Sequence, residues 1–167
     1  GAEEDVLHDI SFTAEPGKTT AFIGSTGCGK STLVNLIPRF YDVTDGKITI
    51  DGKDIRNVSQ HELREKLGYV PQKAVLFSGD IASNILYGNP EGSEAEMTEA
   101  ATIAQATEFI EQKKKKYKST ISQGGSNVSG GQKQRLSIAR AIAKHPDVYI
   151  FDDSFSALDY KTDATLR

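Results

Sequence analysis

The chain has 167 residues, of which 37% are hydrophobic and 26% charged, and its formal net charge is −3. This length is typical of a single domain with its own core. No apolar run approaches the ~20 residues that a transmembrane helix needs. The acidic balance argues against general nucleic-acid binding, which requires clustered positive charge.

Two further features of the sequence indicate the cellular compartment in which the protein is expected. The single cysteine, Cys28, excludes an intramolecular disulfide and favours a reducing compartment. The stretch from Gly1 to Asp5 is acidic where a signal peptide would carry basic residues, so we expect no signal peptide.

The first part of the chain predicts a β-rich entry followed by a helix. Residues 6–13 alternate apolar and polar side chains, a Glu15-Pro16-Gly17 turn follows, and residues 19–23 (T-T-A-F-I) form a strand-like run. Apolar residues in 33–37 then indicate a buried helix, which Pro38 must end because proline is not accommodated in a helix interior.

A glycine-rich loop lies between that strand and that helix. It reads G-S-T-G-C-G-K-S-T and fits the phosphate-loop pattern G-x-x-x-x-G-K-[ST]. Its glycines let backbone N–H groups turn toward phosphate oxygens, and the following helix adds the positive end of its dipole. A glycine-rich turn that binds nothing is the alternative, which Lys30 and Ser31 in register disfavour. We predict a nucleoside triphosphate site formed by Gly24, Ser25, Thr26, Gly27, Cys28, Gly29, Lys30, Ser31 and Thr32.

Two residues of this loop have specific expected tasks. Lys30 can reach the β- and γ-phosphates as a point charge. The Ser31 hydroxyl is placed to ligate a Mg²⁺ that bridges them. The expected cofactors are therefore ATP or a related nucleotide and Mg²⁺.

Shorter elements are expected after Pro38. Residues 47–51 (K-I-T-I-D) predict a strand between two turns, and 59–67 have the cap and spacing of a short helix. A strand ending at 68–70 follows. Asp80 is expected to cap a short helix that reaches Leu86 and is stopped by Gly88.

The second half of the chain is expected to be mainly helical. Residues 93–113 predict a helical stretch with a break near Ala106-Thr107, and 130–144 predict a long helix. The apolar run Val148 to Phe151 is typical of a strand buried on both faces of a parallel sheet. The buried face of the long helix is predicted to contain Leu136, Ile138, Ala139 and Ile142. Together these elements indicate an α/β fold with an inserted helical part.

One basic cluster interrupts this pattern. It is the lysine run from Lys113 to Lys116, followed by Tyr117 and Lys118. Such a run can bind nucleic acid or lipid headgroups, but a short charge run is more often a solvated face or loop. We interpret it as a solvated face and expect no nucleic-acid partner.

Two acids follow the last predicted strand. Asp152 stands where a phosphate-loop enzyme holds Mg²⁺ opposite the loop serine, usually through water. Asp152 could instead merely cap the strand end. If the glycine-rich loop binds phosphate, two acids directly after four apolar residues favour the metal-binding role for Asp152.

The stretch N-V-S-G-G-Q, residues 127–132, opens the long predicted helix. Ser129 can cap this helix, and Gly130 and Gly131, which have no side chains, leave its first N–H groups accessible to an anion. Such a turn alone is weak evidence, since it is common loop punctuation. The order of a phosphate loop, Gln72 after a strand, V-S-G-G-Q and I-F-D-D resembles the nucleotide-binding domain of ATP-binding cassette (ABC) transporters. The resemblance covers nearly the whole chain.

The resemblance implies an α/β phosphate-loop NTPase core with a mostly parallel sheet, an N-terminal antiparallel β part and an inserted helical subdomain that carries the signature. It implies one domain with a β-rich core at 1–72, a helical subdomain at 73–140, and a last strand and D-loop at 141–167. This protein would be a domain truncated at both ends. It would act at the cytoplasmic face of the cell membrane, beside the transmembrane domains of a transporter.

The resemblance also assigns roles to matching residues. Gln72 would approach Mg²⁺ and the attacking water. Catalytic roles fall to Asp153, Gln72 and Lys30, and metal ligation to Ser31, Gln72 and Asp152. A second nucleotide-binding domain is implied as partner, whose ATP would contact the signature residues Ser129, Gly130, Gly131 and Gln132. The D-loop that crosses the dimer interface would be Ser156, Ala157, Leu158 and Asp159.

The stretch from Leu76 to Gly88 resembles that of exporters, and three departures from the family pattern qualify the assignment. Asp153 stands where active members carry glutamate, so the hydrolytic water would be poorly held and turnover slow. Gln123 replaces a glutamate that exporters often carry before the signature. The switch histidine and the aromatic that stacks on adenine fall outside the chain.

Several readings remain open at this point. The signature with Asp153 suggests the slow half of a heterodimeric exporter, whereas a slow homodimer could use aspartate as its base. A regulatory half that holds ATP without turnover is a further alternative. A non-transport ABC ATPase acting in DNA repair or translation would need a coiled-coil insertion or duplicated cassettes. A small-molecule kinase would leave Ser129 to Gln132 without a purpose.

Overall fold

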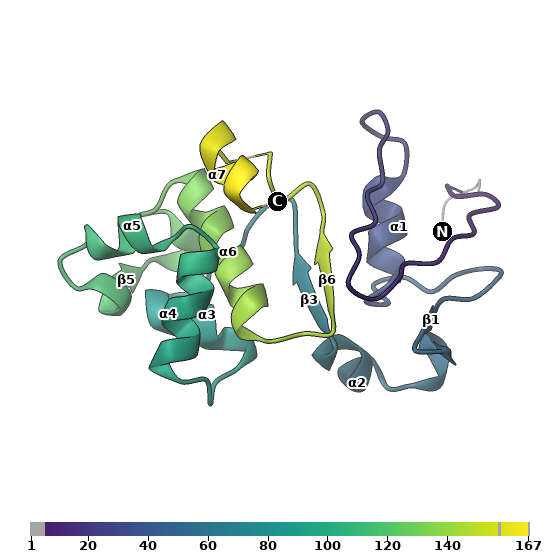
Figure 1. Ribbon diagram of the computed structural model, residues 1–167, viewed down its shortest axis with the longest axis horizontal. Helices are drawn as coiled ribbons and strands as arrows, with labels where there is room; N and C mark the ends of the chain where they lie inside the picture. Colours follow the sequence, from purple (N-terminus) through teal and green to yellow (C-terminus); the bar gives the residue numbers. More distant parts are fainter. Residues whose placement is uncertain (1–5, 157, 167) are drawn as a thin grey trace. The chain divides into compact units, whose positions relative to one another are not determined.

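The computed structural model describes residues 6–156 and 158–166. The chain divides into two compact units, Gly1–Arg64 and Glu65–Arg167, which we call the N-terminal and C-terminal units. Figure 1 shows the helices and strands of both.

The N-terminal unit contains few regular elements. Its helices are α1 (Lys30–Leu36) and α2 (Gln60–Glu65), with the 3₁₀ turn η1 (Ile55–Asn57) before α2. The helix expected after the glycine-rich loop is confirmed and ends before Pro38. The helix expected at 59–67 is confirmed as the shorter α2.

A small hairpin connects these helices. Its strands β1 (Thr49–Ile50) and β2 (Lys53–Asp54) pair antiparallel, with Thr49 opposite Asp54 and Ile50 opposite Lys53. Asp51 and Gly52 form the turn and both have positive φ, 51° and 76°, which suits the right-handed twist of a two-residue hairpin. The strand expected at 47–51 is thus present but shorter.

Two expected strands of this unit are absent from the described residues. Neither 6–13 nor 19–23 forms a ladder with another segment. Ile23 is 96% exposed, and Ile10 and Phe12 are also exposed. A strand needs a paired neighbour and a covered face, and alternation or β propensity alone supplies neither. The prediction of strands in these two segments is wrong for this structure.

The C-terminal unit holds most of the regular structure. Its strands are β3 (Leu67–Val70), β4 (Gly79–Asp80), β5 (Thr120–Ile121) and β6 (Val148–Phe151). Its 3₁₀ turns are η2 (Leu86–Gly88), η3 (Lys116–Lys118) and η4 (Gln123–Gly125). Its helices are α3 (Ile81–Ile85), α4 (Glu94–Ile103), α5 (Thr107–Glu111), α6 (Gly130–Ala143) and α7 (Tyr160–Leu166).

Strands β3 and β6 form the parallel pair of this unit, with Leu67 opposite Val148 and Val70 opposite Phe151. Helix α6 packs beside β3. The expectation that β6 is buried on both faces is wrong. Ile150 is buried, whereas Tyr149 and Phe151 point to the other face and are 44% and 37% exposed. Side chains alternate across a strand, so only one face of this strand is covered.

Helix α6 is central to the helical part and packs against α3 and α4 (Figure 1). Leu136, Ile138 and Ala139 are buried as predicted, and Ile142 is partly buried against the same core. The caps also follow the sequence, since Asp80 caps α3 and Ser129 caps α6. The expected break at Ala106-Thr107 separates α4 from α5.

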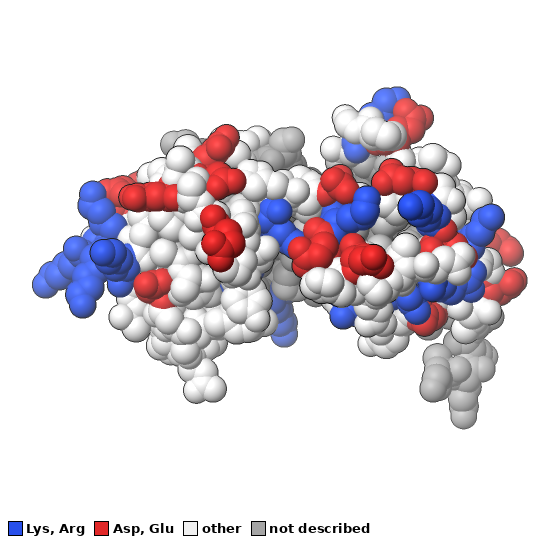
Figure 2. All heavy atoms as spheres, turned by 90° about the horizontal axis from the view of Figure 1, so that it is seen from below, with Lys and Arg blue, Asp and Glu red and all other residues white. Residues whose placement is uncertain are grey.

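The lysine run follows α5 at an end of the C-terminal unit. Figure 2 shows basic side chains gathered at this end, whereas elsewhere on the visible face acids and bases are mixed. Lys114, Lys115 and Lys118 are exposed, and Lys116 Nζ pairs with Glu111 at 2.6 Å. The lysine run is therefore solvated in this structure.

Candidate nucleotide site

The glycine-rich loop of the N-terminal unit takes backbone conformations that its sequence requires. Gly27 and Gly29 have φ of 83° and 92°, in the left-handed region that favours glycine. Gly29 is the N-cap residue of α1 and offers no capping side chain. The N–H groups of the first helical turn therefore have no side-chain cap there, as an anion site requires.

Lys30 folds over this loop. Its Nζ donates to the carbonyl oxygens of Gly24 at 2.7 Å and Ser25 at 2.8 Å, and lies 3.6 Å from Sγ of Cys28. A Cβ at position 24 would lie 2.5 Å from Cys28 Sγ, so a larger residue there would require the Cys28 side chain to move. The ammonium is held inside the curve of the loop. Ser31 follows in the first turn of α1 and is exposed.

In the C-terminal unit, the two acids after β6 have different environments. The backbone N–H of Asp152 donates to the Val70 carbonyl at 3.0 Å and extends the β3–β6 ladder by one bond. Tyr69 OH donates to Asp152 Oδ2 over a long 3.5 Å. Burial, helped by the negative charge of Asp152, raises the pKa of Tyr69 to about 12. The phenol therefore remains a proton donor to Asp152 at neutral pH.

Asp153 lies beside Gln72. The Gln72 side-chain Nε2 donates to Asp153 Oδ2 at 2.9 Å. Asp153 has a φ of 45°, a left-handed conformation that aspartate tolerates better than most residues. Its carbonyl accepts from Ser156 Oγ at 2.9 Å. The backbone turn and the glutamine together fix where the Asp153 carboxylate points.

A buried serine anchors this turn. Ser154 Oγ donates to the Val70 carbonyl at 2.7 Å, so the residue after Asp153 is tied to the end of β3. Sequence reasoning did not single out this residue, nor Tyr69. A serine within an acidic turn carries no distinctive sequence signal.

The signature residues form a helix start with reciprocal caps. Ser129 Oγ accepts from the Gln132 N–H at 3.2 Å, and the Ser129 N–H donates to Gln132 Oε1 at 3.1 Å. This is a capping box with glutamine at its third position. Ser129 and Gly130 are exposed, and Gly130 has open space around its α-carbon. The helix N-terminus is therefore accessible to a ligand.

The expected D-loop leads into α7, although Ala157 lies outside the described residues. Asp159 caps α7, accepting from Thr162 N–H at 3.0 Å and from Thr162 Oγ1 at 2.7 Å. These bonds from Thr162 lower the pKa of Asp159. Ser156 is exposed and Leu158 is partly buried.

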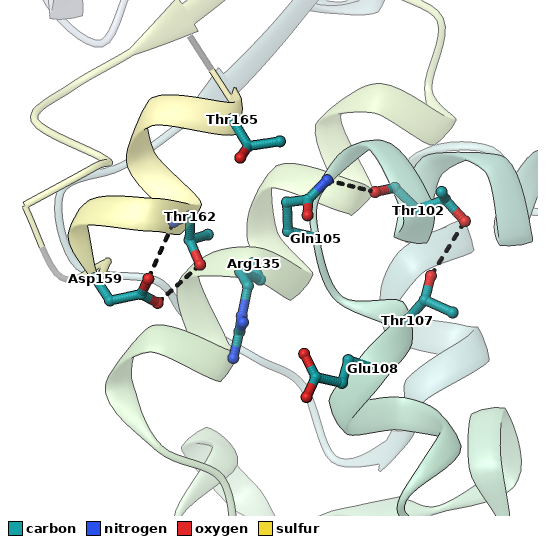
Figure 3. Close-up of a pocket in the computed structure, with 8 residues that line it drawn as sticks. All are labelled: Thr102, Gln105, Thr107, Glu108, Arg135, Asp159, Thr162 and Thr165. Atoms are coloured by element: carbon teal, nitrogen blue, oxygen red, sulfur yellow. Dashed lines mark hydrogen bonds between the residues drawn. The ribbon is translucent and has the colours of Figure 1, made fainter.

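A polar hollow of about 310 Å³ opens beside Asp159 (Figure 3). Arg135 from α6 points into it, between Asp159 and Glu108. The guanidinium lies 5.1 Å from the Phe109 ring centroid, and its Nε is buried without a hydrogen-bond partner among the described residues. The lining of the hollow thus contains one positive side chain, Arg135, and two negative ones, Asp159 and Glu108. Its charge therefore does not indicate whether a ligand would be an anion or a cation.

The structure brings some predicted residues together within each unit. Gln72 and Asp153 are hydrogen-bonded, and Asp152 lies at the end of the same strand pair. Gly24 to Gly29 form one loop that leads directly into Lys30 and Ser31 at the start of α1. Gln132 meets Ser129. Sequence reasoning missed Gln134 and Arg140 of α6, which bond to the chain around Gln72. Their one signal is that they are polar residues in a helix with a buried apolar face.

The proposed metal ligands are hard oxygen donors. Mg²⁺ is typically held by one or two carboxylates together with water and substrate phosphates, rather than by an all-protein cage. Asp152, the Ser31 hydroxyl and the Gln72 amide oxygen fit this chemistry. Within 6–156 and 158–166, no group of three or more His, Cys, Asp or Glu could hold a metal alone.

Comparison with known proteins defines the class. Residues 7–156 match the sequence model of the family described as ABC transporter. The chain belongs to this family. A solved bacterial Atm1-family ABC exporter with ATP bound has a TM-score of 0.82 and 44% identity over 85% of this chain and 25% of that one. This likeness confirms the predicted phosphate-loop NTPase fold.

Curated relatives agree with this assignment. An uncharacterized ABC transporter ATP-binding protein of Mycobacterium tuberculosis (strain ATCC 25618 / H37Rv) is 52% identical over 170 residues, which cover 100% of this chain. A Staphylococcus aureus (strain NCTC 8325 / PS 47) protein, whose assigned name suggests a multidrug export ATP-binding/permease protein, is 45% identical over 165 residues and 99% of this chain. The chain spans 29% and 28% of these relatives' lengths. Among the described residues, no helix is both long and apolar enough to cross a membrane.

Proposed function

We propose that this chain is the ATP-binding and ATP-hydrolysing part of an ABC exporter subunit. The observation that carries the proposal is the loop in which Lys30 Nζ is held by the Gly24 and Ser25 carbonyls at the start of α1. Triphosphate oxygens offer this ammonium charge-assisted bonds that are stronger than those to neutral carbonyls. The exporter assignment is supported by the names of the S. aureus relative and of the solved neighbour.

We propose that the chain is a single ATP-binding domain with three parts, 1–72, 73–140 and 141–167. The roles of its residues follow the family pattern. Gly24 to Thr32 bind the phosphates, and Ser31, Asp152 and Gln72 supply oxygen ligands for Mg²⁺. The metal, when bound, neutralises charge on the β- and γ-phosphates. Asp153 and Gln72 orient the attacking water, and the bond between them supports this pairing.

We propose that hydrolysis at this site is slow. Aspartate is one methylene shorter than glutamate, and a general base must come within about 2.6–3.2 Å of the proton that it takes. In addition, Asp153 Oδ2 already accepts the Gln72 amide. A subunit that holds ATP and regulates a faster partner is the second candidate function, and the same residue favours it.

The proposed partner is a second nucleotide-binding domain. Ser129, Gly130, Gly131 and Gln132 would contact the ATP that the partner holds, which the exposure of Ser129 and Gly130 supports. Ser156, Leu158 and Asp159, with Ala157, would line the contact between the two domains.

A second proposed contact is with the transmembrane domains of the same transporter, which would place this chain at the cytoplasmic face of the membrane. Val75 and Phe77, which follow Gln72, are exposed, as is Tyr87, whose ring stacks on that of Phe77 at 4.3 Å between centroids. Contiguous exposed apolar residues often mark protein interfaces. We propose this patch as the docking surface.

The test is ATP binding and Mg-ATP turnover by the full-length subunit, in wild type and in Lys30→Met. Methionine keeps an unbranched side chain of nearly the same length and removes its charge. We expect wild type to bind ATP and the variant to lose most of that affinity. Equal ATP binding by both proteins would refute the proposed site.

A further inference from the structure

The segment that carries Gln72 is tied to α6 on both sides of that residue. Gln134 Nε2 donates to the carbonyl of Pro71 at 3.1 Å, directly before Gln72. Arg140 Nη1 donates to the carbonyl of Val75 at 3.0 Å, three residues after it. Two side chains from one helix therefore bracket the loop.

Gln134 is an exceptional residue within its helix. It is 2% exposed and lies among the buried residues Leu136, Ser137 and Ile138. A buried amide without a partner would cost about 1–3 kcal/mol, so its burial depends on the bond to Pro71. An apolar side chain of similar size would fill the same space without this dependence. The Gln134 amide therefore gives the loop a hydrogen bond that an apolar side chain would not provide.

Arg140 is part of a hydrogen-bond network around the buried side chain of Asn84. Its Nε and Nη2 donate to the backbone oxygen and to Oδ1 of Asn84, both at 2.9 Å. The Asn84 side chain, 1% exposed, also accepts from Phe77 N–H and donates to Phe77 and Asp80 carbonyls, each at 2.9 Å. All hydrogen-bonding positions of this amide are thus used.

The same guanidinium reaches the exposed apolar patch. It lies 5.0 Å from the Phe77 ring centroid and 5.8 Å from that of Tyr87. Burial lowers the pKa of Arg140, but a guanidinium remains charged in proteins. Its planar fork makes three hydrogen bonds in fixed directions, which a lysine cannot reproduce.

We propose that Gln134 and Arg140 are positioning residues that make segment 71–77 and helix α6 move as one piece. Two bonds to a stiff helix prevent the loop from absorbing a displacement of Phe77. A shift at 75–77 is then carried both to Gln72, and so to its bond with Asp153, and to Ser129 at the start of α6. The inference rests on the proposed function and adds the residues that link these sites.

Three variants of the full-length subunit, in its assembled transporter, test this. Gln134→Met keeps volume and helix propensity but removes the donor to Pro71. Arg140→Lys keeps the charge but loses the fork. Asn89→Leu is the matched control, because Asn89 Nδ2 also donates to a backbone carbonyl, that of Ala143 at 3.1 Å, without touching 71–77. The measurements are kcat and KM for Mg-ATP, Tm, and hydrogen exchange in 71–77.

We expect Gln134→Met and Arg140→Lys to lower kcat about 10- to 100-fold, because small misplacements of a catalytic group have such effects. KM for ATP should change little, since the phosphate loop is intact. Exchange in 71–77 should rise in these two variants and not in Asn89→Leu.

Two results would overturn the inference. One is a lowered Tm with kcat and exchange in 71–77 unchanged, which marks a purely structural role. The other is an equal effect of Asn89→Leu. A wild-type subunit that neither binds nor hydrolyses ATP would instead refute the proposed function, and hydrogen exchange would still decide whether Gln134 and Arg140 hold the loop.

Discussion

Gln72 Nε2 lies 2.9 Å from Asp153 Oδ2, although 81 residues separate them in the chain. The parallel pairing of β3 and β6 explains the meeting. Val70 is opposite Phe151, and Gln72 and Asp153 each follow two residues later. Beyond the strands the chain turns at Asp153, whose φ is 45°, and the Asp153 carboxylate then accepts the Gln72 amide. The register of the β3–β6 pair and the turn at Asp153 together set the geometry around the proposed base.

Replacing Asp153 with glutamate should raise ATP turnover. The added methylene moves the carboxylate toward the water, and a well-placed general base typically contributes about 10²–10⁴-fold. We expect steady-state Mg-ATP hydrolysis by the full-length subunit, purified without any other half-transporter, to rise about tenfold or more. Asp153→Asn, which keeps the shape and removes the charge, should show no rise.

The alternative outcome is also informative. If Asp153→Glu turns over ATP no faster than wild type, Asp153 is not what holds this site back. An active site completed by a different chain would then explain slow turnover, and co-purification should be used to find that chain.

Ser129 and Ser93 allow a matched test of the signature. Both serines cap a helix in the same reciprocal way, Ser93 with Glu96 at the start of α4 and Ser129 with Gln132 at the start of α6. Replacing either with alanine should cost about 1 kcal/mol of unfolding free energy. Only Ser129→Ala should also lower ATP turnover of the assembled transporter.

The control separates stability from function. Chemical denaturation should give similar losses for the two variants, and activity per folded molecule should differ. Equal turnover in Ser93→Ala and Ser129→Ala would contradict a role of Ser129 beyond capping.

A related comparison tests the asymmetry between the two ATP sites. If the phosphate loop of this chain belongs to the slow site while its signature completes the partner's site, Lys30→Ala and Ser129→Ala should reduce turnover unequally. The larger loss is expected from Ser129→Ala, measured as kcat in the assembled transporter. An equal loss from both would show that the two sites contribute alike.

The helices of this protein were more predictable from sequence than its strands. Asp80, Ser93 and Ser129 cap their helices through residues three positions away, so the signal and the structure are both local. The end of α1 before Pro38 is also a local effect, because proline is not accommodated in a helix interior. The phosphate loop was predictable because its glycines and Lys30 act within nine residues.

Strands depend on partners that lie elsewhere in the chain. The run at 19–23 has strand-forming residues, yet it pairs with no described segment. β4 and β5, two residues each, pair across 40 residues and had no sequence signal. The bonds from Gln134 and Arg140 to the loop span 63 and 65 residues and were likewise invisible. The features that could not be predicted from the sequence are mainly contacts between residues far apart in the chain.

The stability of the N-terminal hairpin should depend on acid pH through Asp54. Its carboxylate accepts bonds from the side chain and the N–H of Arg56, which lower its pKa from 3.8 to about 2. The folded state therefore binds fewer protons than the unfolded state between these values. The stabilisation is present above the unfolded pKa and is lost as pH falls through about 2.

Asp54→Asn should remove this dependence. Hydrogen exchange at 49–57 of the intact chain would be measured from about pH 5 to about pH 2. Wild type should lose protection across this window more steeply than the variant. Asp45→Asn is the control, since Asp45 makes no hydrogen bond or ion pair within the described part of the chain. Parallel profiles for wild type and Asp54→Asn would exclude the mechanism.

Cys28 provides a direct reporter of nucleotide in the phosphate loop. It is the single cysteine of this chain, it is exposed, and its sulfur lies 3.6 Å from Lys30 Nζ. Bound phosphates would cover this thiol, and ATP at about 100 times its Kd would leave only about 1% of sites free. N-ethylmaleimide should therefore modify Cys28 about tenfold or more slowly with Mg-ATP, followed by peptide mass spectrometry of the full-length subunit. Lys30→Met should lose this protection, and modification of the wild type at the same rate with and without Mg-ATP would place the nucleotide elsewhere.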